Sequence, residues 1–150
     1  MLQRILVLSL IFLAGFLSHD LYSQWITTPL DVQGPHQRIL DNQVEIQPDH
    51  VVLRIPNAQF AGFTATHSMD PVIDSDSNAL EVIPQTEEDI HIGDIVSYEY
   101  RGSILIHRVV GKGTDSEGTY YIMKGDNVNT PDPAKVRFGQ IQRVLVAILY

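Results

Sequence analysis

Residues 94–110 read DIVSYEYRGSILIHRVV, and this stretch decides the fold that we expect. Residues on both sides of the Arg101-Gly102 pair follow a period close to two, which is typical of β-strands. Two such runs separated by a pair that contains Gly are typical of a β-hairpin. The sequence therefore predicts an antiparallel hairpin of strands 94–100 and 103–110.

Shorter runs of the same kind lie on both sides of this hairpin. They are rich in Val, Ile, Leu and aromatic residues and are bounded by Gly, Pro or Asn. No long amphipathic helix pattern lies among them, so we expect a mainly β, barrel-like domain over residues 51–150. The further strands that we expect are 51–55, 60–66, 119–124 and 141–150, with a short alternation at 44–46.

Residues 72–92 are acidic with an apolar centre, and we expect them to form a solvated loop or a hairpin. The start of this segment resembles a calcium-binding loop. However, Ala79 stands where such a loop needs Gly, and Gln85 stands where it needs a bidentate Glu. The sequence therefore predicts neither a metal site nor a cofactor site.

An uncharged apolar run, ILVLSLIFLAGFL, occupies residues 5–17, directly after Arg4. The run is shorter than the ~20 residues that span a bilayer comfortably, which leaves a cleavable signal peptide as an alternative. Tyr22 and Trp25 extend it with aromatics typical of a membrane interface, and Arg4 favours an inside N-terminus. We therefore expect a transmembrane helix, a signal anchor, over residues 1–25, a linker over 26–50 and the β-rich domain outside.

Composition limits the classes of partner. The chain has 10 Lys and Arg against 18 Asp and Glu, a formal charge of −8, which argues against binding to nucleic acid. The same charge disfavours electrostatic attachment to anionic lipid, so membrane attachment depends on apolar residues. The chain has no Cys, which excludes disulfides and thiolate metal sites.

Three short blocks carry the groups that acyl transfer needs. They are residues 68–71 (SMDP), 107–109 (HRV) and 124–127 (KGDN). They offer a hydroxyl nucleophile, an imidazole base and a carboxylate, and any chain order can build such a site. A free serine is a weak nucleophile at neutral pH, so Ser68 needs a base. The plainer alternative is that Ser68 only shapes a turn before Pro71.

His107 lies in a predicted strand, where alternation places it on one face with Leu105 and Val109. Partial burial among apolar neighbours keeps an imidazole neutral and able to accept a proton. A histidine in such a run can also be an ordinary core residue. The competing imidazole is His67, but adjacent strand residues point to opposite faces, so we expect it to face away from the Ser68 hydroxyl.

Two aspartates compete for the third role: Asp126, within the KGDN block, and Asp132, six residues later. Either one can also be simply an exposed, turn-forming residue of a loop beside Gly and Pro. An oxyanion hole needs donors aimed at developing negative charge. The backbone N–H of Ser68 and the hydroxyl of Thr66 are the predicted donors.

These blocks resemble the type I signal peptidase family over about residues 51–150. The best match is the archaeal and endoplasmic-reticulum branch, in which His replaces the bacterial Lys as base. The resemblance implies a signal-peptidase-like β-fold and a membrane-bound serine endopeptidase that removes signal peptides from exported preproteins outside the membrane. It implies that Ser68 is the nucleophile, His107 the base, Asp132 the carboxylate that orients His107, and Asp126 a supporting residue.

The resemblance also implies the partners: preprotein signal peptides and a lipid bilayer, with accessory subunits left open. In the family a Gly-Asp pair follows the SMxP block within a few residues, whereas here Gly93-Asp94 comes only after residues 72–92. Lys124 matches a family position that is not the base, and we interpret it as structural. Two alternatives remain: an inactive, peptide-binding relative, and a self-cleaving peptidase of the related repressor group, against which His107 in place of Lys counts.

Overall fold

The computed structural model describes Gly15 and residues 32–150. The predicted signal anchor, residues 1–25, lies outside the described residues except for Gly15. Among the described residues, no helix is long and apolar enough to cross a membrane. The chain divides into the units Met1–Val32 and Gln33–Tyr150, and the second unit carries all the elements below.

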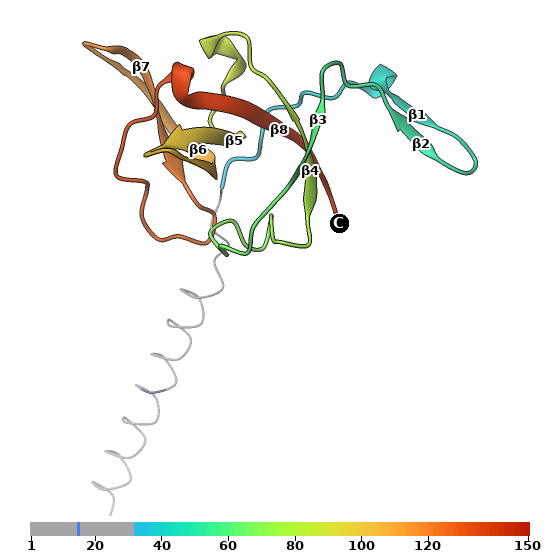
Figure 1. The fold of residues 1–150 in the computed structure, drawn as a ribbon, viewed down its shortest axis with the longest axis horizontal. Coiled ribbons are helices and arrows are strands. Elements are labelled where there is room, and N and C mark those ends of the chain that lie inside the picture. The colour runs from blue at the N-terminus through green and yellow to red at the C-terminus, as the bar shows by residue number, and fades with distance from the viewer. Residues whose placement is uncertain (1–14, 16–31) are drawn as a thin grey trace, which may run out of the picture. The chain divides into compact units, whose positions relative to one another are not determined.

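Residues 33–150 are mainly β and form two antiparallel sheets, with no α-helix among them (Figure 1). The larger sheet has the strand order β3-β4-β8-β5-β6-β7, so β3 and β7 are its edges. Its strands are β3 (Gln59–Gly62), β4 (Asn78–Val82), β5 (Ile95–Tyr100), β6 (Ser103–Asp115), β7 (Gly118–Lys124) and β8 (Ile141–Leu149). The smaller sheet pairs β1 (Val44–Ile46) with β2 (Val51–Leu53), and three short 3-10 turns cover Asp41–Gln43, Glu87–Asp89 and Phe138–Gln140.

The predicted hairpin is confirmed as β5 and β6. Arg101 and Gly102 both have positive φ, 51° and 79°, the turn geometry whose twist matches that of the two strands. β6 is longer than predicted, and it pairs with β7 only from Arg108 onward. Residues 103–107 therefore have β5 on one side and no strand on the other.

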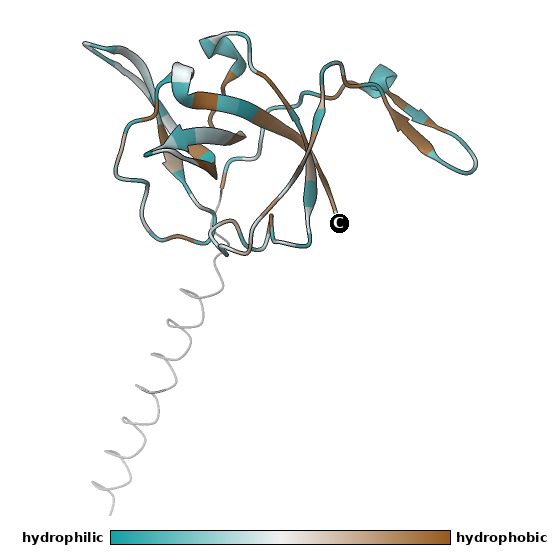
Figure 2. Cartoon of the chain, viewed as in Figure 1, coloured by the Kyte–Doolittle hydropathy of each residue, from teal (hydrophilic) through white to brown (hydrophobic). Residues whose placement is uncertain are grey.

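The core lies on both faces of the larger sheet, and β8 alternates hydrophobic and hydrophilic stretches accordingly (Figure 2). Leu105 and Val109 pack on one face, and Ile106 packs on the other, as the alternation in β6 predicts. Full burial of one such side chain contributes about 1.5–3 kcal/mol. The first face buries Ile90, Val96, Tyr98, Val109, Tyr121, Met123, Val136, Ile141 and Val144, and the second buries Met69, Ile73, Ala79, Ile95 and Leu145.

The acidic segment 72–92 differs from the expected solvated loop or hairpin. It contains β4, which lies inside the sheet between β3 and β8. β4 buries Ala79 and Glu81, one small and one charged residue, while its larger apolar residues are half-buried. The inward face therefore lacks the apolar residues by which a buried strand is recognised in a sequence.

Two predicted strands are shorter than expected. β3 ends at Gly62, whereas the prediction continued to Thr66, because the backbone turns before His67, whose φ is 59°. β2 ends at Leu53, ahead of Pro56. The alternation at 44–46 does form a strand, but it pairs only with β2.

Part of the predicted linker belongs to the domain. The carboxylate of Asp94 is fully buried, and it accepts hydrogen bonds from the backbone N–H of His36 (2.9 Å), from Arg38 (2.6 Å) and from the backbone N–H of His91 (2.9 Å). A Cβ atom at Gly93 would lie 2.1 Å from the carbonyl oxygen of Gly34. Residues 33–38 are thus fixed to the turn that precedes β5.

Candidate active site

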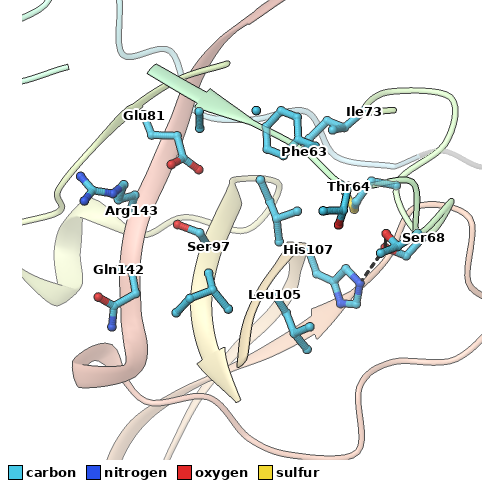
Figure 3. Close-up of a pocket in the computed structure, with 16 residues that line it drawn as sticks. Phe63, Thr64, Ser68, Ile73, Glu81, Ser97, Leu105, His107, Gln142 and Arg143 are labelled. Atoms are coloured by element: carbon cyan, nitrogen blue, oxygen red, sulfur yellow. Dashed lines mark hydrogen bonds between the residues drawn. The ribbon is translucent and has the colours of Figure 1, made fainter. Parts of the chain in front are cut away.

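The structure brings Ser68, His107 and Asp132 together. His107 Nε2 lies 3.2 Å from Ser68 Oγ, and His107 Nδ1 lies 2.7 Å from Asp132 Oδ2 (Figure 3 shows the first bond). Ser68 follows β3, His107 lies on β6, and Asp132 lies in the loop after β7. The order hydroxyl, imidazole and carboxylate is that of a Ser-His-Asp triad, and a slightly long Ser–His distance is common in an unliganded site.

Asp132 is held by two groups in addition to His107. Its backbone N–H donates to the carbonyl of Met123 over 2.8 Å, and the hydroxyl of Tyr98 donates to the same Oδ2 atom that contacts His107. Burial raises the pKa of Tyr98, and the bond to the Asp132 carboxylate raises it further. Tyr98 therefore stays protonated and acts as a donor near neutral pH.

Sequence reasoning missed Tyr98, although the hairpin contains the signal. The turn at residues 101–102 fixes a register in which Val96 lies opposite His107. Tyr98 is two residues beyond Val96, so it lies on the same face as His107, diagonally across the strand pair. The Tyr98 hydroxyl is a polar group on an otherwise apolar face, and this identifies Tyr98 as a neighbour of the imidazole.

Asp126 pairs with Arg108 and not with His107. Arg108 Nε and one terminal nitrogen donate to the two oxygens of Asp126 over 2.7 and 2.6 Å, and the other terminal nitrogen donates to the carbonyl of Gly93 over 2.8 Å. Both side chains are largely buried. The two aspartates that compete in the sequence thus have different partners on opposite faces of β6.

The loop at residues 124–127 holds the backbone around Ser68. The backbone N–H of Asn127 donates to the carbonyl of Ser68 and its side-chain amide donates to that of His67, both over 2.9 Å. A Cβ atom at Gly125 would lie 2.5 Å from the Ser68 carbonyl oxygen and 3.2 Å from His107 Nε2. Only glycine therefore fits between the nucleophile and the base.

His67 does not reach the Ser68 hydroxyl. Its side chain is exposed, and its Nδ1 lies 3.1 Å from Asp70 Oδ2. Its φ of 59° is uncommon for a residue other than Gly, and backbone conformations of this kind cluster at functional sites.

The two predicted oxyanion donors both lie beside the Ser68 hydroxyl. Thr66 Oγ1 is 3.3 Å from Ser68 Oγ. The backbone N–H of Ser68 donates to no acceptor among the residues that the structure describes. The backbone N–H is therefore free to bind a developing oxyanion, and the Thr66 hydroxyl, which contacts the nucleophile itself, lies close enough to turn toward it.

Ser68 and His107 lie at one end of a cleft of about 640 Å³. The cleft is lined by residues of β3 and of the part of β6 that has a strand on one side only, and by residues of β4, β5 and β8 between them. Apolar side chains such as Phe63, Ile73 and Leu105 form most of its wall near the nucleophile, and polar side chains lie at the far end (Figure 3).

One group of potential metal ligands lies among the described residues. The ligand atoms of His67, Asp70 and Asp74 are within 4.8 Å of one another, beside Ser68. His67 and Asp74 are exposed, and Asp74 Oδ1 accepts a hydrogen bond from the backbone N–H of Ser75. Lys124, interpreted as structural, is half-buried and lies outside this group.

Comparisons with known proteins gave no match among family models, curated proteins or solved structures.

Proposed function

We propose that this chain is a membrane-bound serine endopeptidase of the signal-peptidase type, which removes signal peptides from exported preproteins. One observation carries the proposal: His107 lies between Ser68 and Asp132, 3.2 Å from the hydroxyl and 2.7 Å from the carboxylate. The resemblance of the three sequence blocks to type I signal peptidases supplies the substrate class.

In the proposed reaction, Ser68 Oγ attacks the scissile carbonyl while His107 Nε2 takes the hydroxyl proton. Asp132 accepts from Nδ1–H, which fixes the tautomer of His107 and stabilises the imidazolium that forms. The backbone N–H of Ser68 and the hydroxyl of Thr66 donate to the oxyanion. His107 then gives its proton to the leaving amine, and the acyl-enzyme is hydrolysed by a water that His107 deprotonates.

The substrate is proposed to bind in an extended conformation along the cleft. β3 is an edge strand, and residues 103–107 of β6 have no strand on one side, so both offer unpaired backbone groups to a peptide. Side chains of the peptide then alternate between the cleft wall and solvent. The resemblance adds a preference for small residues one and three positions before the cut.

The proposed location is a single-pass membrane protein with its catalytic domain on the extracytoplasmic side. Two observations support it. An apolar run at residues 5–17 follows Arg4, and the net negative charge of the chain disfavours electrostatic attachment to anionic lipid, so that the apolar residues must provide the attachment. The proposed partners are signal peptides and the bilayer. Nucleic acid is not among them.

The test is cleavage of a preprotein by the detergent-solubilised full chain, with the new N-terminus mapped by mass spectrometry. We expect one cut at the end of the signal peptide, and none with Ser68→Ala. An intact preprotein that nevertheless binds the protein would contradict the proposal and favour the inactive, peptide-binding alternative. A change in the mass of the chain itself, without cleavage of the preprotein, would favour the self-cleaving alternative.

A further inference from the structure

The far end of the cleft contains a row of polar side chains on three neighbouring strands, two of them buried and the third, Arg143, half-buried. Glu81 comes from β4, Arg143 from β8 and Ser97 from β5, and Ser97 is paired with Arg143 in the register of the sheet. Glu81 is only 5% exposed and Ser97 7%. All three line the same cleft as Ser68 but lie at its opposite end (Figure 3).

This row has hydrogen-bonding capacity that the described protein does not fill. Ser97 and Arg143 both favour the charged form of the Glu81 carboxyl, yet burial is the larger influence and raises the pKa of Glu81. One terminal nitrogen of Arg143, Nη1, is buried without a hydrogen-bond acceptor among the described residues. A buried donor without a partner costs stability, as does a partly compensated carboxyl.

Stability alone does not explain such a row. Apolar residues of similar volume are often as stabilising as buried charged groups, or more so. Ionisable groups buried in the wall of a cleft are, by contrast, common at binding and catalytic sites. The position within the cleft, and not only the burial, therefore points to a role in ligand binding.

The two charges restrict what can bind beside them. An anionic side chain is repelled by Glu81, a cationic one is repelled by Arg143, and an apolar one leaves both groups unpaired. A carboxamide or a hydroxyl can accept from Arg143 and donate to Glu81 at the same time. We infer that Glu81, Ser97 and Arg143 form a specificity subsite for a neutral, hydrogen-bonding side chain of the bound peptide, such as that of Gln, Asn or Ser.

This inference rests on the proposed function in one respect, that the ligand of the cleft is a peptide. The subsite is separate from the positions next to the cut, where small residues are expected, because it lies at the opposite end of the cleft from Ser68. It concerns a residue several positions away from the scissile bond. A site that is built to hydrogen-bond its ligand rejects an analogue without the polar group far more strongly than an apolar pocket rejects a change in size.

Binding can be measured separately from cleavage with the full chain carrying Ser68→Ala, in detergent. The probes are fluorescent peptides of one extended scaffold in which Gln, Leu, Glu or Lys occupies each position in turn, followed by anisotropy. We expect one position at which the Gln peptide binds about tenfold more tightly than the other three, the size of one well-placed hydrogen bond to a charged group. Absence of binding, or equal affinity for all four at every position, would overturn the inference.

Charge variants in the Ser68→Ala background give the sharper test. Glu81→Gln leaves Arg143 uncompensated, so the preference at that position should move toward Glu, whereas Arg143→Gln should move it toward Lys. The matched controls are Glu45→Gln and Arg54→Gln, the same changes in an exposed ion pair of β1 and the chain after β2. These controls should not change the preference. Folded variants with the original preference would show that the row has a structural role only.

Should either single variant fail to fold, two others keep the inference testable. Ser97→Ala removes only the hydroxyl and should weaken the preference for Gln. The double variant Glu81→Gln, Arg143→Gln contains no unpaired charge and should lose discrimination between Glu and Lys. Cleavage by the unmodified chain is measured in parallel: cleavage without side-chain preference would refute the subsite, and preference without cleavage would refute the peptidase.

Discussion

β6 carries two adjacent basic side chains that bind two aspartates on opposite faces of the strand. His107 makes a single bond to Asp132, and His107 lines the open cleft. Arg108 makes two bonds to Asp126 and a third to the Gly93 carbonyl, away from the cleft. An imidazole can gain and lose a proton near neutral pH, whereas a guanidinium cannot. One face therefore has a pair suited to proton transfer, and the other has a pair that can only hold the structure.

The largest effect should come from the nucleophile and the base. We expect Ser68→Ala and His107→Ala each to lower turnover by about 10⁶-fold, as in serine proteases, and the double variant to be no worse, because members of one catalytic unit fail together. Turnover of a preprotein by the purified chain checks this. His67→Asn, which tolerates the positive φ, is the control and should stay near the unmodified rate. Substantial activity in either alanine variant would refute the triad.

The second largest effect should be the loss of turnover in Asp132→Asn, which distinguishes the roles of the two aspartates. Asp132→Asn can present an N–H to His107 and favour the wrong tautomer, which costs about 10⁴-fold in a known serine protease. We expect a loss of this order in turnover with a nearly normal melting temperature. If Asp132→Asn keeps its turnover while Asp126→Asn is folded but inactive, the roles of the two faces are reversed.

Asp126→Asn should act on stability. Removing one partner leaves Arg108 charged and buried, and breaking a buried pair in this way typically costs about 3–5 kcal/mol. We expect a lower melting temperature and a lower denaturant midpoint, with activity lost in proportion to the unfolded fraction. Asp115→Asn, in a partly exposed cluster with Lys135 and Arg137, is the control and should have a smaller effect. Equal losses would show that the Arg108 pair contributes no more than a surface pair.

Tyr98→Phe should have the smallest effect on rate. Loss of one bond to the Asp132 carboxylate is worth about 1.5 kcal/mol, or about tenfold in kcat/KM. Without that donor Asp132 holds the imidazolium more strongly, so the acidic limb of the pH–rate profile should move to higher pH. A merely structural role would leave this limb in place.

The same variant has a signature at alkaline pH. The pKa of Tyr98 is raised above the ordinary 10.0, so its contribution to stability is complete below about pH 10 and is lost as the pH rises above that value. Tyr98→Phe should therefore lose less stability than the unmodified chain in this range. Burial raises the pKa of Tyr121 to about 12. Tyr121 is present in both proteins, so it accounts for the alkaline loss of stability that remains in Tyr98→Phe. Identical alkaline unfolding curves would contradict this account of Tyr98.

Much of the sheet could be predicted because its signals are local. Alternation along residues 94–110 defines two strands, the Arg101-Gly102 pair defines their turn, and together they fix the face on which His107 lies. β4 could not be predicted with the same ease. Its buried face carries Ala79 and Glu81, so its position inside the sheet depends on contacts made with β3 and β8.

The partners of the two aspartates could not be predicted from local sequence patterns. Asp126 and Asp132 both follow β7, among Gly, Asn and Pro, and nothing in the neighbouring residues distinguishes them. Their partners are decided by the path of the loop, which crosses from one face of β6 to the other between the two residues. From the residues alone both assignments are open, and the bonds to Arg108 and His107 separate them.

The docking of residues 33–38 against Asp94 has a practical consequence for anyone who wishes to prepare a soluble fragment. A cut before Val51, where the sequence alone places the start of the domain, removes His36 and Arg38 and leaves the fully buried Asp94 carboxylate without two of its donors. Asp94 also precedes β5, whose register with β6 positions His107. A fragment intended for crystallisation or inhibitor screening should therefore begin no later than Gln33.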